Sequence, residues 1–258
     1  MRADPSTWVV IPSRLNSTRL PQKALHLIAG KPLIVRVVEG ALQSRRAEKV
    51  IVATDHVSIV DAVQKFVSGH RVECVLTPPE LPSGTDRCLH AVLQFPQAEQ
   101  PQRVLNIQGD EPLIEGVFID ELIEAWDLRA DVSLLTTARP FADVADIQNP
   151  NMVKVLLNSR SEAIYFSRFP IPFSRNQPIS GQTLINPLHH IGIYGFQIEF
   201  LKKFCSVGVS SIEQSESLEQ LRALQMGSSI YVHLTNRNLI GVDTLDDVKR
   251  VEAYFSKK

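Results

Sequence analysis

The sequence has 258 residues, of which 44% are apolar and 21% are charged, and its formal net charge is −1. These values are typical of a globular protein and argue against a general affinity for nucleic acid or for membrane surfaces. The three cysteines lie far apart without a C-x-x-C spacing, so no zinc site is expected. Their odd number, without a secretory signal, favours a cytoplasmic location. No apolar run reaches the roughly 18 residues that a membrane span needs.

Apolar strand-like runs alternate with helix-period segments over the first half of the chain. Strands are predicted at Trp8–Ile11, Lys49–Asp55, Val72–Leu76, Arg103–Asp110 and Asp131–Thr137. Helices are predicted at Pro32–Ser44, Val57–Phe66, Thr85–Phe95 and Gly116–Trp126. This alternation predicts an α/β fold with a mainly parallel sheet and helices on both faces. Sheets of this kind bind ligands beyond the carboxyl ends of their strands.

From about residue 140 the regular alternation stops. Strands are predicted at Met152–Leu157, Ala163–Phe166, His190–Phe196 and Ile230–Leu234. Helices are predicted at Ile198–Phe204, Ile212–Met226 and Leu245–Phe255. Prolines punctuate the polar stretch 170–188 and predict a loop or edge excursion there. The sequence shows no internal repeat, and we expect a single domain over residues 1–258.

The first predicted strand stops at Pro12 and leads into a polar loop with three cations, Arg14, Arg19 and Lys23, and no acid among them. The Gly-rich Walker and dinucleotide-binding patterns are both missing. A loop of this kind would hold phosphate mainly through side-chain charge, with Arg14 forking two oxygens and Lys23 acting as a point charge. The alternative is a solvated loop whose cations make surface ion pairs.

Two motifs place carboxylates close to predicted element ends. Asp110 follows Gly109 at the end of the fourth strand, where a carboxylate suits a hard cation such as Mg²⁺. The alternative there is an ordinary Gly-Asp turn before a proline. Asp243 comes just before the last helix, which it or Thr244 could simply cap. If Asp243 meets Asp110, the two carboxylates could share a metal ion.

Three other segments carry polar groups with ordinary structural explanations. Ser83–Arg87 begins a helix that could face a base or ribose, with Thr85 as a plausible N-cap. The adjacent His189 and His190 alternate faces of a strand, so one of them points inward, as many structural histidines do. A helical row of three glutamates usually forms a solvated face: Glu213, Glu216 and Glu219.

Together these segments resemble the 3-deoxy-manno-octulosonate cytidylyltransferases, also called CMP-Kdo synthetases. The resemblance runs from Val9 to Val251. Eleven motifs carry it in the family's order: Ile11–Arg14, Ser17–Pro21, Gly30–Pro32, Val52–Asp55, Ser83–Arg87, Asn106–Pro112, Asn149–Asn151, Tyr165–Arg168, His190–Tyr194, Leu218–Arg222 and Gly241–Thr244. Each motif alone is a weak signal, but their joint occurrence in this order is highly specific.

The resemblance implies that CTP reacts with Kdo, the eight-carbon acid sugar 3-deoxy-D-manno-octulosonate, to give CMP-Kdo and pyrophosphate for lipopolysaccharide biosynthesis. It implies Mg²⁺ as cofactor and a three-layer α/β nucleotidyltransferase fold with a mainly parallel central sheet. It also implies a homodimer, with an insertion around residues 165–195 that serves dimerisation and sugar binding. CTP and Kdo are the expected small-molecule partners, and neither nucleic acid nor a membrane is expected.

The resemblance further assigns roles position by position. It implies catalytic roles for Arg14, Lys23 and Asp110. It implies nucleotide binding by Ser13, Arg14, Arg19, Lys23, Ser83, Gly84 and Gln108. It implies sugar binding by Arg168, His190, Tyr194, Glu213 and Glu216. The metal ligands would be Asp110 and Asp243.

The chain departs from the usual family pattern beside several of these motifs, at Gln22, Ala24, Leu81, His189, Gln214 and Ser215. One alternative function is therefore a CMP-sialic-acid-type synthetase or another sugar-acid cytidylyltransferase. Another is a nucleotide-binding protein that has lost catalysis. The presence of both Asp110 and Asp243 argues against the second alternative, because a silent binder has no need of two metal carboxylates.

Overall fold

The computed structural model describes residues 4–17, 19–173, 175, 187–237 and 239–256. The chain divides into two compact units. Unit 1 comprises Met1–Glu124, Gln197–Leu201 and Asn238–Lys258, and unit 2 comprises Ala125–Phe196 and Lys202–Arg237. The single domain expected over residues 1–258 stays a prediction.

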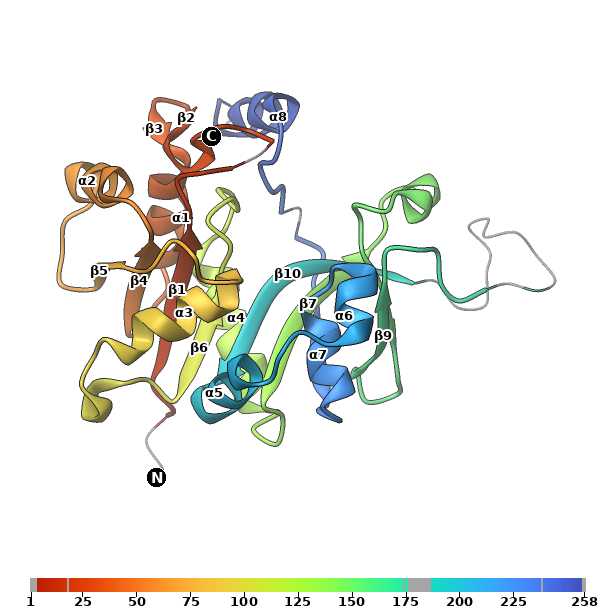
Figure 1. The fold of residues 1–258 in the computed structure, drawn as a ribbon. Coiled ribbons are helices and arrows are strands. Elements are labelled where there is room, and N and C mark those ends of the chain that lie inside the picture. Colours follow the sequence, from red (N-terminus) through yellow and green to blue (C-terminus); the bar gives the residue numbers. More distant parts are fainter. Residues whose placement is uncertain (1–3, 18, 174, 176–186, 238, 257–258) are drawn as a thin grey trace. The chain divides into compact units, whose positions relative to one another are not determined.

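Unit 1 is built on four parallel strands in the order β6-β1-β4-β5 (Figure 1). These strands are β1 (Thr7–Ser13), β4 (Lys49–Thr54), β5 (Val72–Leu76) and β6 (Arg103–Asn106). All seven residues of β1 are buried, as expected for a central strand whose two faces are both covered. The apolar run Trp8–Ile11 therefore forms the middle of the core of unit 1.

Three helices connect these strands, namely α1 (Leu33–Leu42), α2 (Val57–Phe66) and α3 (Gly84–Leu93). Parallel strands are joined by right-handed crossovers, so α1 and α2, which lead outward from β1 to β5, cover the same face. The chain then returns from β5 to β6, and α3 covers the opposite face, in front of the sheet in Figure 1. The winding thus reverses between β1 and β6, where sheets of this class leave a crevice for ligands.

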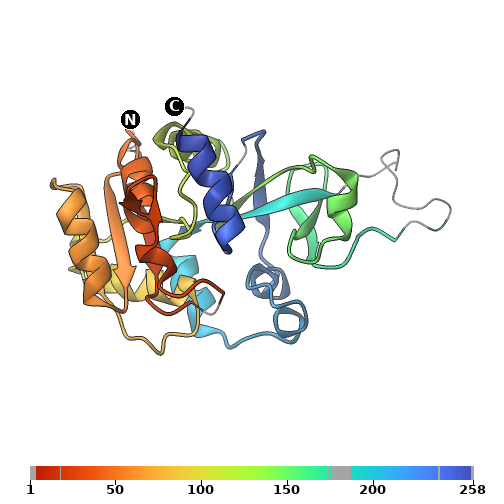
Figure 2. The same ribbon diagram turned by 90° about the horizontal axis from the view of Figure 1, so that it is seen from above.

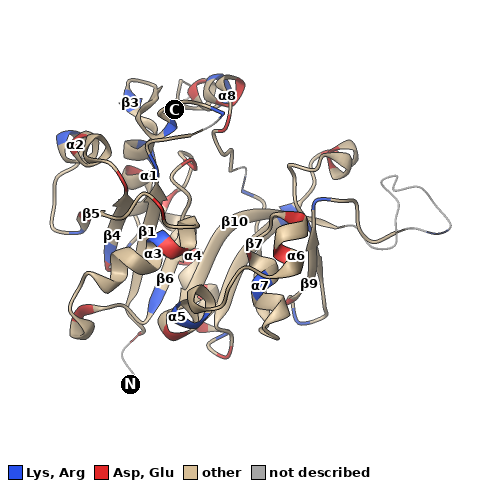
Figure 3. Ribbon diagram, viewed as in Figure 1, with Lys and Arg blue, Asp and Glu red and all other residues tan. Residues whose placement is uncertain are grey.

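The last helix of unit 1, α8 (Leu245–Phe255), packs against the first turn of α1. Its apolar face joins a buried cluster of Leu20, Ile28, Leu33, Leu113, Val242, Val248 and Val251. The Arg36 guanidinium of α1 lies 4.5 Å from the centroid of the Phe255 ring of α8, and Figure 2 shows the two helices side by side. Charged residues lie along α8, whose ribbon is coloured by charge in Figure 3, and its exposed Lys249 and Asp246 form an ion pair.

Shorter elements complete unit 1. They are the 3₁₀ turns η1 (Lys23–Leu25) and η2 (Gln97–Glu99) and the two-stranded sheet of β2 (Leu27–Ile28) and β3 (Lys31–Pro32). Helices α4 (Gly116–Asp127) and α5 (Ile198–Ser206) each begin in unit 1 and end in unit 2.

Unit 2 contains strands of both directions. Strand β7 (Leu134–Pro140) pairs in parallel with β11 (Ile230–Leu234) and antiparallel with β10 (Leu188–Gln197). Strand β8 (Lys154–Leu157) pairs antiparallel with β10 and with β9 (Ala163–Ser167). The helical elements of the unit include η3 (Val144–Gln148), α6 (Ser211–Glu216) and α7 (Gln220–Gln225).

The predicted α/β class with a mainly parallel sheet is confirmed. Several predicted strands differ at their ends by a few residues, and the largest differences are that β6 already stops at Asn106 and that β7 begins only at Leu134. The single helix predicted over Ile212–Met226 is wrong. It is split because Ser217 adopts the left-handed conformation, with φ 50°, and this ends α6 before α7 begins.

The polar excursion predicted at 170–188 lies largely outside the described residues, which exclude 174 and 176–186. Within the described part of the chain, no helix combines the length and the apolar character needed to cross a bilayer.

Candidate functional site

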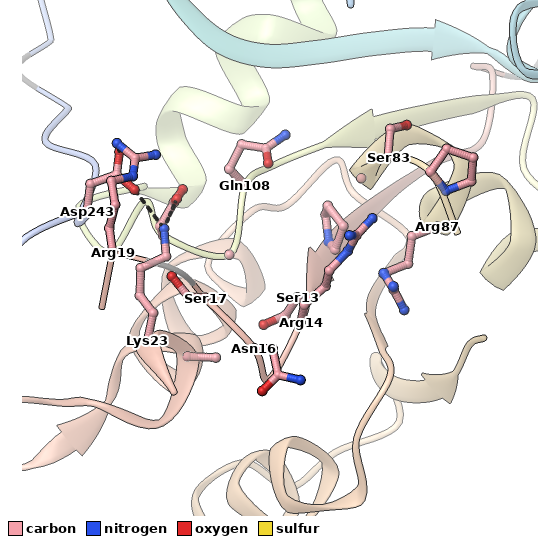
Figure 4. Close-up of a pocket in the computed structure, with 16 residues that line it drawn as sticks. Ser13, Arg14, Asn16, Ser17, Arg19, Lys23, Ser83, Arg87, Gln108 and Asp243 are labelled. Carbon is pink, nitrogen blue, oxygen red and sulfur yellow. Dashed lines mark hydrogen bonds and ion pairs between the residues drawn. The ribbon is translucent and has the colours of Figure 1, made fainter. Parts of the chain in front are cut away.

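A cavity of about 430 Å³ opens in unit 1 at the carboxyl ends of β1 and β6 and at the first turn of α3 (Figure 4). It lies where the winding of the sheet reverses, as the general rule for such sheets requires. The cavity is lined by every residue that the sequence assigns to nucleotide or metal: Ser13, Arg14, Arg19, Lys23, Ser83, Gly84, Gln108, Asp110 and Asp243.

The cationic loop after β1 is shaped by contacts with neighbouring loops. Leu15 donates its backbone N–H to Asp55 Oδ1 at 2.9 Å, just beyond the end of β4. Arg14 is exposed and donates from Nη2 to the Leu81 carbonyl oxygen at 2.5 Å. The loop ends where Lys23 begins η1. Side-chain charge rather than a glycine-rich cradle therefore faces the cavity, as the sequence predicts.

The two acids of the site lie far apart in the sequence, Asp110 near the middle of the chain and Asp243 near its C-terminus. The Val242 N–H donates to the Asp110 carbonyl oxygen at 2.9 Å, and this bond ties the segment before α8 to the loop after β6. A Cβ at Gly109 would lie 3.0 Å from the Pro12 carbonyl oxygen, a tight contact, so glycine at this position favours the close approach of the loop to β1. The two contacts together bring Asp243 beside Asp110.

Lys23 bridges both carboxylates, as Figure 4 shows. Its Nζ lies 2.5 Å from Asp110 Oδ2 and 3.0 Å from Asp243 Oδ1. Arg19 reaches the other oxygen of Asp243, with Nη1 2.9 Å from Oδ2. Burial by itself lowers the pKa of Lys23, but the charges and hydrogen bonds of Asp110 and Asp243 outweigh burial and raise it. Lys23 and Arg19, which have no acid beside them in sequence, are thus paired with acids by the fold, whereas Arg14 donates to a carbonyl oxygen.

The donor set fits a hard divalent cation. One oxygen of Asp110 and one of Asp243 already contact a single positively charged atom, the Nζ of Lys23. Mg²⁺ is typically held by one or two carboxylates together with phosphate oxygens. The cations that line the same cavity are suited to hold those phosphates.

The N-caps of α3 and α8 lie beside the site, and the first of them differs from the residue expected from the sequence. Ser83, not Thr85, is the N-cap of α3, and its Oγ accepts the backbone N–H of Asp86 at 3.1 Å. Thr244 is the N-cap of α8 and forms a capping box with Asp247. The cap role that the sequence left open for Asp243 therefore belongs to Thr244, and the Asp243 carboxylate faces Lys23 instead.

Gln108 and the start of α3 form the remaining wall. Gln108 donates from Nε2 to Asn106 Oδ1 at 3.2 Å, and Asn106 donates in turn to Thr85 Oγ1 at 3.2 Å. A Cβ at Gly84 would lie 3.3 Å from Pro12 Cγ, so the first turn of α3 lies close against the end of β1. This wall combines amide groups with exposed backbone, which suits recognition of a base and ribose.

Arg87 of α3 also lines the cavity and was not singled out from the sequence. Its side chain is fully buried, donates from Nη1 to Thr77 Oγ1, and has Nη2 4.0 Å from Asp55 Oδ2. Burial lowers its pKa, which the Asp55 charge partly offsets. One signal was available, because position 87 lies one turn before Ala91 on the buried face of an amphipathic helix.

Two predicted sugar-binding residues, His190 and Tyr194, lie together on β10 in unit 2. The centroids of the His190 and Tyr194 rings lie 5.6 Å apart. His190 Nε2 also lies 2.9 Å from the Thr136 hydroxyl oxygen, Oγ1. Burial, aided by the charge of His189, lowers the pKa of His190 to about 3, so its imidazole is neutral near pH 7. Tyr194 donates to Gln220 Oε1 at 3.0 Å, and burial raises the pKa of its phenol.

Arg168 and Glu216 form a second group in unit 2. Glu216 accepts from Ser167 Oγ at 2.6 Å and from the Arg168 backbone N–H at 2.8 Å. The Arg168 guanidinium donates from Nε to the Glu216 carbonyl oxygen at 2.7 Å and from Nη1 to the Pro150 carbonyl oxygen at 3.0 Å. Both side chains are therefore held in place by several hydrogen bonds.

Glu213 stands apart from the other predicted sugar-binding residues. It is buried, so the solvated face that the glutamate spacing suggested is wrong for this position. Arg222 pairs with it through two contacts, Nη2–Oε1 at 2.6 Å and Nε–Oε2 at 2.8 Å. Its Oε2 also accepts the Ser210 backbone N–H in the capping box that begins α6. The carboxylate is thus engaged in holding α6 and α7 together, and its role in sugar binding stays a prediction.

Comparison with known proteins identifies the family of the chain. The cytidylyltransferase family profile matches residues 8–230. The chain is 44% identical, over 100% of both chains, to a 3-deoxy-manno-octulosonate cytidylyltransferase of Polynucleobacter necessarius subsp. necessarius (strain STIR1). It is 41% identical to a protein of the same name from Bdellovibrio bacteriovorus (strain ATCC 15356 / DSM 50701 / NCIMB 9529 / HD100), over 96% of this chain and 97% of that one.

A solved structure has the same fold as this chain. It is a CMP:2-keto-3-deoxy-manno-octonic acid synthetase complexed with CTP, which is 34% identical and superposes with a TM-score of 0.88 over 98% of this chain and 99% of that chain. Identity at this level over the full length, together with the profile match, shows the family. The chain belongs to the 3-deoxy-manno-octulosonate cytidylyltransferases, the CMP-Kdo synthetases.

Proposed function

We propose that the chain transfers CMP from CTP to the anomeric hydroxyl of Kdo and releases pyrophosphate. The observation that carries this proposal is the meeting of Lys23 with Asp110 and Asp243 in one cavity, in a chain that belongs to this family. Transfer of a nucleotidyl group requires positioning and charge neutralisation rather than a covalent enzyme intermediate. The cavity offers cations for the triphosphate and carboxylates for a metal.

The cations of the loop after β1 bind the triphosphate in this proposal. Arg14 and Lys23 lie where they can neutralise the negative charge that grows on the departing pyrophosphate, and for that reason both are catalytic residues. Ser13 and Arg19 add binding contacts from the same loop. Arg14 is the group best suited to fork two phosphate oxygens, because a planar guanidinium presents paired donors.

Asp110 and Asp243 would hold Mg²⁺. When bound, the ion would neutralise phosphate charge and help to orient the attacking hydroxyl. The carboxylates themselves fix the position of that charge, since Asp110 follows a buried strand and its backbone is bonded to Val242.

The remaining predicted residues bind the base and the sugar. Ser83, Gly84 and Gln108 would contact the cytidine, in keeping with the amide and backbone groups that they place on the cavity wall. The sugar acid would be bound by Arg168, His190, Tyr194, Glu213 and Glu216. Arg168 is the natural partner for the carboxylate of the sugar. His190 would act as a neutral hydrogen-bonding group because burial keeps it uncharged.

The enzyme would act in the cytoplasm as a homodimer. Exposed apolar side chains gather in one short stretch of unit 2, where Ile164, Phe169 and Phe173 are 57%, 74% and 87% exposed. Such clusters are typical of protein interfaces, and Phe169 and Phe173 fall within the segment around 165–195 that the family resemblance assigns to dimerisation.

The test is pyrophosphate release from CTP and Mg²⁺ with a panel of acid sugars that includes Kdo and a sialic acid. We expect release with Kdo. Release with sialic acid alone would move the substrate to the CMP-sialic-acid class. If the chain binds CTP but turns over none of these sugars, it is a nucleotide-binding protein without this activity, and the catalytic proposal is overturned.

A further inference from the structure

Two carboxylates that are candidates for a divalent cation are already neutralised by the chain itself. Lys23 Nζ contacts Asp110 and Asp243, and Arg19 contacts the second oxygen of Asp243. We propose that Lys23 is an internal counter-ion that opposes metal binding until the nucleotide arrives, so that metal and CTP bind cooperatively. This inference rests on the proposed function, because it concerns the order in which the ligands of that reaction bind.

The first argument is that Lys23 contacts the carboxylate oxygens that a metal ion would need. The Lys23 ammonium lies 2.5 Å from Asp110 Oδ2 and 3.0 Å from Asp243 Oδ1, so it uses one oxygen of each acid. A divalent cation shared by the two acids would need oxygens of the same pair. The Lys23 side chain is only 17% exposed, so it is held between the acids rather than lying loosely over them.

The second argument is charge. Two aspartates face one lysine and one arginine, so the four groups sum to zero. A site without net negative charge attracts a divalent cation weakly, and the nearby ammonium repels it. Removing the lysine charge while keeping both acids would therefore turn a neutral site into one that attracts metal.

The third argument is that CTP can release the lysine. The triphosphate would bring several anionic oxygens to the same cavity, which Lys23 and Arg14 both line. A lysine side chain is a flexible stem with three rotatable donors and can exchange a carboxylate for a phosphate oxygen. Once its charge is compensated by phosphate, both aspartates are free to bind metal. Coupling of this kind is reciprocal, so metal would strengthen CTP binding by the same factor.

The Lys23 bridge is not needed to hold the two aspartates together. The segment that carries Asp243 is already attached to the loop of Asp110 by the Val242 N–H bond to the Asp110 carbonyl oxygen. Val242 is also fully buried in the cluster that anchors α8. The two carboxylates would therefore stay close together without Lys23, and the bridge is free to open.

The experiment measures Mn²⁺ binding to the full chain by electron paramagnetic resonance of the free ion, with and without CTP and without sugar. We expect weak Mn²⁺ binding by the wild type alone and a rise of at least about tenfold in affinity when CTP is added, within the range usual for coupled sites. Lys23→Met should bind Mn²⁺ at least about tenfold more tightly than the wild type when CTP is absent. Its coupling between Mn²⁺ and CTP should shrink accordingly.

Matched variants separate charge from side-chain loss. Lys23→Gln should behave like Lys23→Met, and it serves in its place if the methionine variant does not fold by circular dichroism. Lys23→Arg keeps the charge and should keep the weak binding. Lys31→Met removes a lysine paired with Glu39 outside the cavity and should leave Mn²⁺ binding unchanged.

The outcomes also separate this inference from the proposed function. If Mn²⁺ binds in the presence of CTP and is lost in Asp110→Asn, but Lys23→Met binds it no better than the wild type, the counter-ion role is overturned and the metal site survives. If CTP induces no Mn²⁺ binding that depends on Asp110 or Asp243, the proposed metal site itself fails. Equally tight Mn²⁺ binding by the nucleotide-free wild type and by Lys23→Met would also overturn the inference.

Discussion

At the scale of single residues, the site depends on the pairing of the Asp110 and Asp243 carboxylates with Lys23. Asp110 and Asp243 are separated by about half of the chain, yet both contact the Lys23 ammonium. Arg14, in contrast, stays exposed and engages a carbonyl oxygen. Lys23 is therefore already paired with two acids, and in the proposed function it would exchange them for phosphate oxygens, whereas Arg14 would have only a carbonyl contact to exchange.

Asp110→Asn should lower the turnover of CTP with Kdo by about 10²-fold or more, because one preorganised charge at the reacting phosphate is lost. The fold should be unchanged, since the backbone bond between Asp110 and Val242 does not involve the side chain. Steady-state pyrophosphate release gives the rate, and circular dichroism provides the folding control. Turnover close to that of the wild type would remove Asp110 from the metal site.

His190 should make the stability of the protein depend on pH. Its pKa is lowered to about 3 by burial, whereas an unfolded histidine has a pKa near 6.5. Below pH 6.5 the unfolded state binds a proton that the folded state does not, so stability falls as the pH drops toward about 3. At pH 5, about 1.5 pH units below the pKa of the unfolded histidine, the loss in the free energy of unfolding is about 2 kcal/mol, since each unit corresponds to about 1.4 kcal/mol.

Urea denaturation of His190→Gln and of the wild type at pH 7, 6 and 5 checks this prediction. The variant should lose less stability over that range, whatever its stability at pH 7. His189, whose pKa is lowered to about 4 mainly by burial, remains in both proteins and provides the common background. Parallel losses in the two proteins would show that His190 does not titrate in this way.

At the scale of secondary-structure elements, helix ends position the site. Ser83 caps α3 beside the cavity, and Thr244 caps α8 directly after Asp243. The backbone N–H groups of Asp243 and Thr244 donate to the Asp247 carboxylate. Burial alone would raise the pKa of Asp247, but these bonds and that of the Thr244 hydroxyl lower it. The same capping box that begins α8 thus orients the backbone of Asp243.

Thr244→Ala should destabilise the protein by about 1 kcal/mol, the usual effect of removing an N-cap hydroxyl. It should also weaken catalysis, because the backbone next to Asp243 loses part of its support. Thr244→Ser keeps the hydroxyl and should restore both properties. Urea denaturation and pyrophosphate release are the two measurements, and an alanine variant as stable as the serine variant would contradict the capping role.

At the scale of the whole molecule, the expected homodimer can be tested directly. Analytical ultracentrifugation of the full chain should give twice the mass of one chain. A double change of Phe169 and Phe173 to serine should weaken the dimer, because both side chains are exposed and apolar. Leu128→Ser is the matched control, since Leu128 is 86% exposed but lies outside this stretch. A dimer unaffected by the double change would place the interface elsewhere.

Much of the fold could be predicted because burial leaves a local signal. The run Trp8–Ile11 is apolar without alternation, which is what a strand covered on both faces requires, and it forms β1. The split of the helix predicted over Ile212–Met226 left no comparable signal, because serine is not a residue that favours φ 50°. The position of Arg87 on the buried face of an amphipathic helix was a signal for its burial, but its partners could not be predicted because they come from two other loops.

The sequence by itself determined the alternation of strands and helices, the cationic loop after the first strand and the motifs of the family. Each of these depends on residues that are close in the chain. Only the tertiary structure decided that Lys23 lies between Asp110 and Asp243 and that Glu213 is engaged by Arg222. The physical reason is that a charge takes its partner from whatever the fold brings within about 4 Å, and sequence distance does not record that proximity.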